Sequence, residues 1–212
     1  MSKVIGIVQL KGGAGRSTVA TNLAAVLAKQ NTVTLVDCDV PQGTSASWYS
    51  LREAEGRQGS LELQTAQRYQ ELLSVLDKAE SDYIVLDAPP RIAEVTRAIL
   101  MISDLLLIPL GASAAEVWAT TDLLDTIEEA EAERPIQSRI VWNKFRAYTR
   151  SAQELSQGVK KELSIPALKT KLGMRVAYSE ALARGLSADE WSDQNARAEV
   201  EALGREVQRL LR

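Results

Sequence analysis

The segment that most constrains the fold is a glycine-rich loop between an apolar run and an amphipathic stretch. Residues 4–8 are almost continuously apolar, as in a strand buried on both faces of a parallel sheet. Residues 11–18 read KGGAGRST, and residues 16–29 have helical spacing. Glycines let the backbone N–H groups approach a ligand, and the N-terminus of a helix favours an anion. This order predicts a phosphate-binding site.

Short apolar runs alternate with longer helical stretches along the chain, which predicts βαβ units. We therefore expect an α/β fold with a mainly parallel, twisted sheet flanked by helices on both faces. The 212 residues fit a single domain, residues 1–212. The pattern places strands at 4–8, 32–36, 61–64, 83–86, 105–109, 139–142 and 167–171, and helices at 16–29, 45–53, 67–78, 92–102, 114–132, 151–163, 177–183 and from 193.

The composition excludes several classes of site. Histidine is absent, which removes Ser-His-Asp and Cys-His catalysis and His-ligated metals. Cys38 is the only cysteine, so no internal disulfide or thiolate zinc site can form. No apolar run approaches the roughly 18 residues that span a bilayer, and the N-terminus does not resemble a signal peptide. We expect a soluble, cytoplasmic protein.

Acidic residues follow two of the predicted strands. Asp37 and Asp39 come after the second strand, and Asp87 directly follows the strand at 83–86. The carboxyl ends of parallel strands form the edge at which α/β proteins bind ligands. A capped strand–helix turn uses the same residue types, but the glycine loop favours a binding site. Aspartate after an apolar strand is also typical of Mg²⁺ binding beside nucleotide phosphates.

These motifs together resemble the ParA/MinD family of ATPases. Residues 11–18 resemble the deviant Walker A motif of that family, with Lys11 at the position of its signature lysine. Residues 37–43 resemble switch I, with Val40 as an extra residue before Pro41, and residues 86–90 resemble the Walker B strand and switch II. Residues 107–120 and 141–144 resemble later segments of plasmid-type ParA proteins. The resemblance implies a P-loop NTPase that binds ATP and Mg²⁺ as an ATP-sandwich homodimer.

The resemblance also implies residue roles. Lys11 would reach the nucleotide of the partner subunit, Asp39 would position the attacking water, and Asn143 would read the adenine edge. Arg16 stands where the family has lysine, so phosphate binding should persist while hydrolysis is slow. The phosphates would be held by Gly12, Gly13, Ala14, Gly15, Arg16, Ser17 and Thr18, and the metal by Ser17, Asp37 and Asp87.

Positive charge is concentrated late in the chain. Residues 139–184 contain ten Lys or Arg against three Asp or Glu, although the net charge is −3. Such a segment suits either a solvated face or a polyanionic partner. In the resembling family, basic residues of this region contact DNA phosphates without sequence preference, and Arg175 and Arg197 are the best positional matches. The candidate DNA-binding residues are Lys169, Lys171, Arg175, Arg184 and Arg197.

Three functions compete. The first is a partition ATPase of the small, ParF-like class, since the first strand begins by Val4 and leaves no N-terminal helix-turn-helix. It would be nucleoid-associated, bind nonspecific DNA and a ParB-like or cargo-adaptor protein, and avoid membranes; its cargo could be a plasmid, a chromosome or a protein compartment. The second is a MinD-like membrane-cycling ATPase, which needs an amphipathic terminal helix. The apolar stripe of the helix predicted from residue 193 is narrow, and we expect it to pack on the core. The third, a dethiobiotin-synthetase-like ligase, is disfavoured by Lys11 and the Asp39 motif. The stripe comprises Val200, Leu203, Val207 and Leu210.

Overall fold

In the part of the chain that the structure describes, seven strands form one sheet in the order β3-β2-β4-β1-β5-β6-β7. The computed structural model describes residues 2–40, 42–118 and 120–212, without the side chains of 114 and 160–162; Pro41 of the switch I motif and Ala119 therefore lie outside it. Every strand pairing in the described ranges is parallel. The strands are β1 (Lys3–Ile7), β2 (Val33–Asp37), β3 (Leu61–Thr65), β4 (Tyr83–Asp87), β5 (Leu105–Gly111), β6 (Gln137–Phe145) and β7 (Ala167–Gly173).

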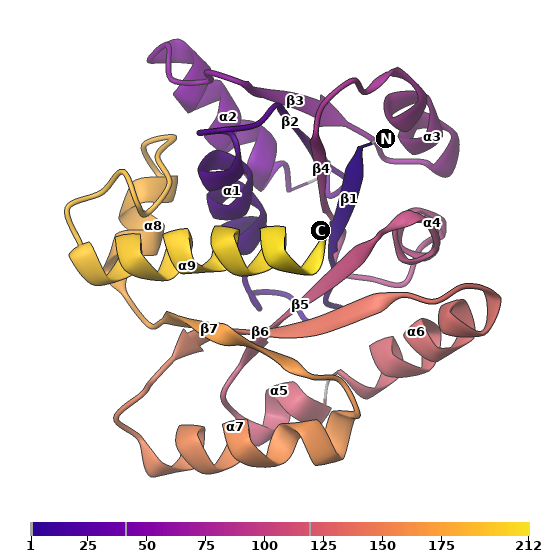
Figure 1. The fold of residues 1–212 in the computed structure, drawn as a ribbon, viewed down its shortest axis with the longest axis vertical. Helices are drawn as coiled ribbons and strands as arrows, with labels where there is room; N and C mark the ends of the chain where they lie inside the picture. The colour runs from indigo at the N-terminus through magenta and orange to yellow at the C-terminus, as the bar shows by residue number, and fades with distance from the viewer. Residues whose placement is uncertain (1, 41, 119) are drawn as a thin grey trace.

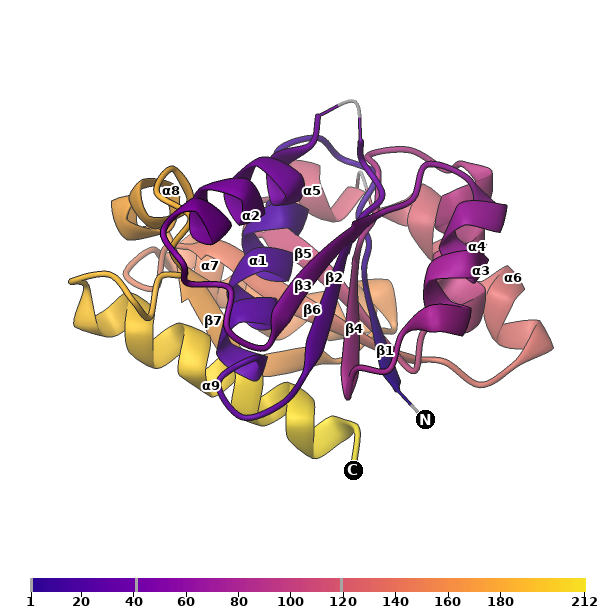
Figure 2. The same cartoon turned by 90° about the horizontal axis from the view of Figure 1, so that it is seen from above.

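Helices cover both faces of this sheet (Figures 1 and 2). On one face lie α1 (Arg16–Leu27), α2 (Thr44–Ala54), α8 (Val176–Leu182) and α9 (Gln194–Leu210). The other face carries α3 (Tyr69–Lys78), α4 (Glu94–Ile102), α5 (Ala114–Trp118), α6 (Thr121–Glu133) and α7 (Arg150–Leu163). The predicted α/β class is confirmed.

Strand β1 explains why its sequence is almost wholly apolar. It lies at the centre of the sheet between β4 and β5. Ile5 and Ile7 pack into the core beneath α1, whereas Val8 belongs to the core on the opposite face. Successive side chains of a strand point to opposite faces, so a central strand covered on both sides needs apolar residues at consecutive positions.

The apolar stripe of the terminal helix is part of the core, as expected. Val200, Leu203 and Val207 are fully buried in the cluster that also contains residues of α1 and β7. Gly204 allows a close approach to α1, because a Cβ added there would come within 2.8 Å of a Val26 methyl group. In the described part of the chain, no helix is both long enough and apolar enough to cross a membrane.

The expected helix over 114–132 was wrong in one respect, because it is divided into α5 and α6. Thr120 between them is fully buried. Its Oγ1 donates to the Glu116 carbonyl at 2.8 Å and accepts from Gln9 Nε2 at 3.1 Å. A contact with a residue more than 100 positions away leaves no mark on helical periodicity, so local sequence could not reveal the break. The remaining predicted elements are confirmed, with ends displaced by a few residues.

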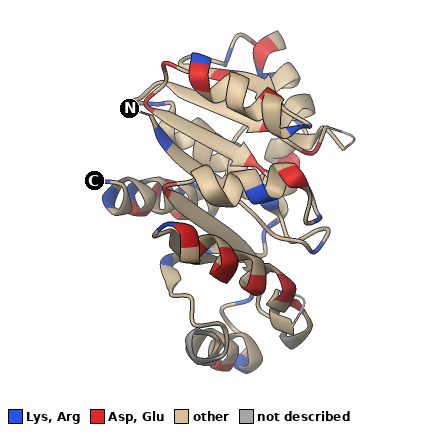
Figure 3. Ribbon diagram, turned by 90° about the vertical axis from the view of Figure 1, so that its right-hand side faces the viewer, with Lys and Arg blue, Asp and Glu red and all other residues tan. Residues whose placement is uncertain are grey.

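Acidic residues gather on the face of the sheet opposite α8 and α9. Helix α6 carries six exposed acidic side chains and no basic residue between 121 and 133, and red marks its acidic positions along the ribbon in Figure 3. Helix α7 of the predicted basic segment lies on the same face of the sheet as α6, whereas α8, near the end of that segment, lies on the opposite face. The acidic residues of α6 are Asp122, Asp125, Glu128, Glu129, Glu131 and Glu133.

Two glycines at positive φ give a matched test of the packing between α2 and the segment after α8. Gly185 has φ +67°, and a Cβ there would overlap the backbone of Leu51 and Arg52. Gly56 has φ +64°, and a Cβ there would meet no atom within 4 Å. We expect Gly56→Ala to lower the free energy of unfolding by about 1 kcal/mol through backbone strain alone. Gly185→Ala should lower it by about 3 kcal/mol, since strain and overlap add. Equal midpoint shifts in urea would contradict this packing.

Candidate phosphate-binding site

The glycine loop leads from β1 into α1 with open space above it. Gly13 has φ +78° and Gly15 has φ +96°. A Cβ on Gly12 or Gly13 would meet nothing within 4 Å, so this side of the loop has room for a ligand. The first turn of α1 holds no acidic side chain, and the bond from the Val19 amide to the Gly15 carbonyl is its first intrahelical bond. The N–H groups of residues 16–18 are therefore available to an anion.

The carbonyl groups of the loop are bound by side chains from β6. Asn143 Nδ2 donates to the Ala14 carbonyl at 2.8 Å, and Lys144 Nζ donates to the Gly13 carbonyl at 2.7 Å. A Cβ on Gly15 would overlap Asn143 Nδ2, so this glycine is required for the contact. Asn143 thus lies against the glycine loop, and its contact with the adenine edge stays a prediction. Sequence reasoning missed Lys144, although a basic residue directly after Asn143 was the available signal.

Arg16 is buried and bonds to backbone carbonyls on both sides of the loop. Its Nε donates to the Ala88 carbonyl at 2.8 Å, and its Nη1 donates to the carbonyls of Gln9 at 2.5 Å and Lys11 at 3.1 Å. Burial lowers the pKa of Arg16, and the nearby carboxylates of the site oppose this effect. The guanidinium therefore links the loop to the first residue after β4. The sequence had indicated a phosphate contact for this side chain, whereas its observed partners are all protein carbonyls.

Two buried carboxylates stand side by side at the ends of β2 and β4, where Asp37 pairs with Asp87 in the sheet register. Asp37 accepts from the amides of Asp39 at 3.0 Å and Ala46 at 2.9 Å, so it fixes the start of α2. Asp87 Oδ2 accepts from Ser45 Oγ at 2.7 Å, while its Oδ1 is buried with no hydrogen-bond partner among the described residues. Burial raises the pKa of Asp87 to about 7.

Asp39 occupies the turn between β2 and α2. Its carbonyl accepts from the amides of Gln42 at 2.9 Å and Gly43 at 2.8 Å. Burial raises the pKa of Asp39, and the positive charge of Arg16 opposes the rise. The loop, Arg16 and the carboxylates thus meet at the carboxyl edge of the sheet, as predicted. Ser45 was missed, because its contact with Asp87 depends on how α2 packs.

The five candidate DNA-binding residues do not share one set of contacts. Arg175 Nη2 donates to Glu199 Oε1 at 2.8 Å, and its Nη1 lies 3.9 Å from Asp193 Oδ2. Lys171 Nζ lies 4.1 Å from the centroid of the Phe145 ring. Lys171 and Arg175 are half-buried and line one cavity of about 440 Å³. Lys169, Arg184 and Arg197 are exposed.

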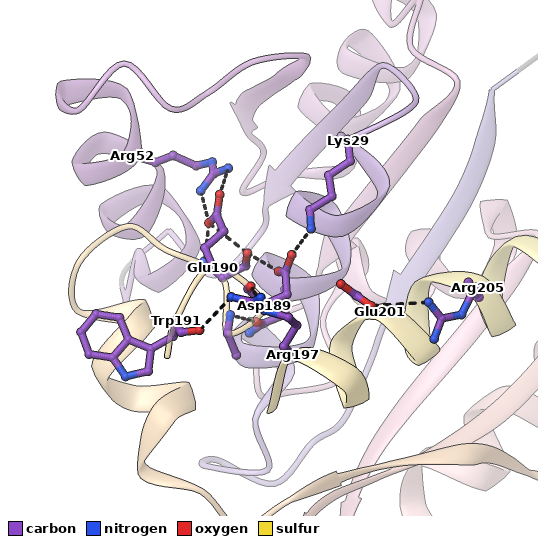
Figure 4. Close-up of polar contacts among 11 residues, drawn as sticks. Lys29, Arg52, Asp189, Glu190, Trp191, Arg197, Glu201 and Arg205 are labelled. Atoms are coloured by element: carbon purple, nitrogen blue, oxygen red, sulfur yellow. Dashed lines mark hydrogen bonds and ion pairs between the residues drawn. The ribbon is translucent and has the colours of Figure 1, made fainter. Parts of the chain in front are cut away.

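Arg184 and Arg197 meet at Trp191, between α8 and α9. The Arg184 guanidinium lies 4.8 Å from the centroid of the Trp191 ring, and Arg197 Nη2 donates to the Trp191 carbonyl at 3.4 Å. Arg197 Nε also donates to the Asp189 carbonyl at 2.9 Å, as Figure 4 shows. These two exposed arginines and the half-buried Trp191 form a surface that we call the Trp191 patch.

The segment next to this patch is bound to α2 and to the end of α1 by ion pairs, which Figure 4 shows, and by a hydrogen bond. Arg52 of α2 binds both carboxylate oxygens of Glu190, at 2.7 and 2.9 Å. Lys29, just after α1, pairs with the buried Asp189. Trp48 Nε1 donates to the Leu186 carbonyl at 2.9 Å. Sequence patterns gave no sign of these contacts, because each joins residues more than 130 positions apart.

Known proteins share this architecture. Residues 5–188 match the family model of the CobQ/CobB/MinD/ParA nucleotide binding domain. The chain is 30% identical over 187 residues to "Maintenance of carboxysome distribution protein A" of Halothiobacillus neapolitanus, covering 86% of this chain and 85% of that protein. Two structures of Cyanothece McdA share the fold: the apo form (TM-score 0.79, 18% identity, 98% of this chain and 100% of that one) and an ATP complex (TM-score 0.75, 19% identity, 98% and 96%). The chain belongs to the CobQ/CobB/MinD/ParA family of nucleotide-binding domains.

Proposed function

We propose that residues 1–212 act as one ParA-type ATPase domain that positions a cargo on DNA. ATP joins two copies of the chain, the dimer binds duplex DNA without sequence preference, and a cargo-recognising partner stimulates hydrolysis and release. The observation that carries this proposal is the meeting of the open glycine loop, Lys11 and the buried carboxylates at one edge of the sheet. The similarity to a carboxysome-distribution protein supports cargo positioning as the task.

Each group of the site has a role in this proposal. The free amides at the start of α1 and the glycine loop bind the phosphates. Asn143 faces the adenine end, and Lys11 enters the site of the second copy. Asp39, whose pKa is raised, orients the attacking water and accepts its proton. Arg16 is hydrogen-bonded to the Ala88 carbonyl, so it contributes little to binding the γ-phosphate, and ATP hydrolysis is slow.

The carboxylates fit Mg²⁺ bound together with a nucleotide. The described residues contain no cluster of three or more His, Cys, Asp or Glu that could hold a metal alone. Mg²⁺ at phosphate sites usually takes one or two carboxylates plus phosphate oxygens and water. Oδ1 of Asp87 is buried and has no hydrogen-bond partner among the described residues, so it is an oxygen atom available to such an ion. Ser17 and Asp87 would hold the ion and Asp37 would support them, and the ion would neutralise charge on the phosphates.

Asp87 predicts a pH dependence for the metal-free protein. The pKa of about 7 in the folded state lies above the ordinary value of 3.8, so the folded carboxyl keeps a proton that the unfolded chain releases. The free energy of unfolding should therefore fall as the pH rises from about 4 to about 7. Asp87→Asn should lose this component while retaining an acceptor for Ser45. Urea unfolding of the wild type and of Asp87→Asn at pH 5 and pH 8 measures this change in the free energy of unfolding. An equal change between the two pH values in both proteins would contradict the raised pKa of Asp87.

The Trp191 patch is the best candidate DNA surface. Its arginines are exposed, and they hydrogen-bond to backbone carbonyls rather than to carboxylates. Arg175 is instead paired with Glu199 and Asp193. The acidic helix α6 lies on the other face of the sheet, where it does not oppose a polyanion on the α8–α9 side. We therefore place the main phosphate contacts at Arg184 and Arg197, with Lys169 as a further contact.

Gel shifts on duplex DNA of arbitrary sequence, with ATP, ADP or no nucleotide, test the function. We expect binding with ATP only, and equal binding in all three conditions would contradict the switch. Arg184→Ala/Arg197→Ala should weaken binding to every sequence and reduce the slope of log affinity against log salt by about two, one per lost phosphate contact. ATP affinity should not change.

Arg97→Ala is the matched control for this experiment, because Arg97 is an exposed arginine of α4 on the opposite face. It should bind DNA like the wild type. Lys11→Ala should stop ATP-dependent dimerisation and DNA binding together. A parallel sedimentation with anionic liposomes tests the MinD-like alternative, and ATP-dependent binding to liposomes but not to DNA would support that alternative.

Arg16→Lys tests why turnover is slow. An ammonium cannot span the carbonyls of Gln9, Lys11 and Ala88 as the planar guanidinium does, so lysine should be freer to meet phosphate. We expect ATP hydrolysis to rise about tenfold and the free energy of unfolding to fall by about 1–2 kcal/mol as these bonds are lost. Steady-state phosphate release and urea unfolding measure the two effects. A variant no faster than wild type would show that Arg16 does not limit turnover.

A further inference from the structure

Lys11 has a partner within its own chain. Its Nζ lies 3.7 Å from Glu116 Oε1 on α5, and the exposed fractions of the two side chains are 39% and 21%. The other carboxylate oxygen of Glu116 accepts from the Gly111 amide at 2.7 Å. The ammonium predicted to enter another subunit is thus directed toward a carboxylate that is fixed at the end of β5.

The backbone around Glu116 fits this carboxylate closely. A Cβ on Gly111 would lie 2.7 Å from the carboxylate carbon and from both oxygens, so only glycine leaves room for it. The Glu116 amide donates to the Ser113 carbonyl at 3.0 Å. Because the carboxylate also accepts from a backbone amide, its position does not depend on Lys11. Glu116 is therefore a fixed counter-charge that Lys11 can join or leave.

A second set of contacts fixes Glu116 relative to the loop. Thr120 Oγ1 donates to the Glu116 carbonyl and accepts from Gln9 Nε2. Gln9 Oε1 in turn accepts from the amides of Leu10 at 2.8 Å and Lys11 at 3.4 Å. A closed ring of contacts thus runs from Lys11 through Gln9 and Thr120 to Glu116 and back. It keeps the carboxylate within reach of the Lys11 ammonium.

We infer that Glu116 is a positioning residue that holds Lys11 in its own subunit until ATP in a second copy displaces it. This inference rests on the proposed entry of Lys11 into the opposing nucleotide site. The pair is partly exposed, so it is weak enough to open. A triphosphate carries more negative charge than one carboxylate and is the stronger partner. Glu116 therefore opposes dimerisation without nucleotide and sets how much ATP-bound protein is needed for it.

Glu116→Gln separates charge from structure, because the amide oxygen still accepts from Gly111 while the negative charge is lost. With ATP, the dissociation constant of the dimer should fall about two- to fivefold, the range expected for a partly exposed pair. The affinity of the monomer for ADP should stay unchanged, which excludes a general charge effect on bound nucleotide. Glu128→Gln on the exposed face of α6 is the control and should dimerise like the wild type. Sedimentation velocity at several protein concentrations measures the constants.

Amine labelling of Lys11, followed by mass spectrometry of the nucleotide-free protein, tests the pair independently of dimerisation. Labelling should be faster in Glu116→Gln than in the wild type and unchanged in Glu128→Gln. Equal labelling, or a Glu116→Gln dimer no tighter than wild type, would overturn the inference. If labelling is faster but the wild type does not dimerise with ATP, the proposed function fails and Glu116 has no role in assembly.

Discussion

The structure depends on how the backbone carbonyl and amide groups in and beside the glycine loop are used: protein side chains bind the carbonyls, and the amides stay free for a ligand. Its carbonyls at Gln9, Lys11, Gly13 and Ala14 are bound by side chains of Arg16, Lys144 and Asn143. The amides at the start of α1 have no intrahelical partner. A buried polar group without a partner is costly, so a loop whose carbonyls are bound inside the protein leaves its amides for an anion. The glycines make this geometry possible, and β6 supplies two of the side chains that bind the loop carbonyls, Asn143 and Lys144.

The sequence predicted the strands and the loop well, because both depend on local chemistry. A central strand such as β1 must be apolar on both faces, and a phosphate loop must contain glycine, so each requirement appears in consecutive residues. The sequence also predicted the aspartates at the ends of β2 and β4, because they stand next to the apolar runs in the chain. Parallel strands place Asp37 and Asp87 at one edge, and their register in the sheet confirms that they are neighbours.

Sequence reasoning was weaker wherever a side chain has a choice of partners. Arg175 and Lys171 look like free charges in the sequence, yet Glu199 and the Phe145 ring bind them once α9 and β6 pack against β7. Thr120 similarly interrupts an otherwise helical stretch because Gln9 binds its hydroxyl. These partners lie tens to more than 100 residues away. Periodicity and spacing report only which face of an element is apolar, so they cannot identify such pairs.

Helix α2 connects the site to the Trp191 patch by ordinary packing. At its first turn Ser45 bonds to Asp87 and the Ala46 amide bonds to Asp37, so the carboxylates fix its N-terminal end. Near its other end Arg52 binds Glu190. The patch therefore rests on a helix whose start is held by the groups that would surround a nucleotide, and the same helix fixes the spacing between the two. Helix α2 is thus a single element that contacts the buried carboxylates at its first turn and the chain beside the patch near its other end.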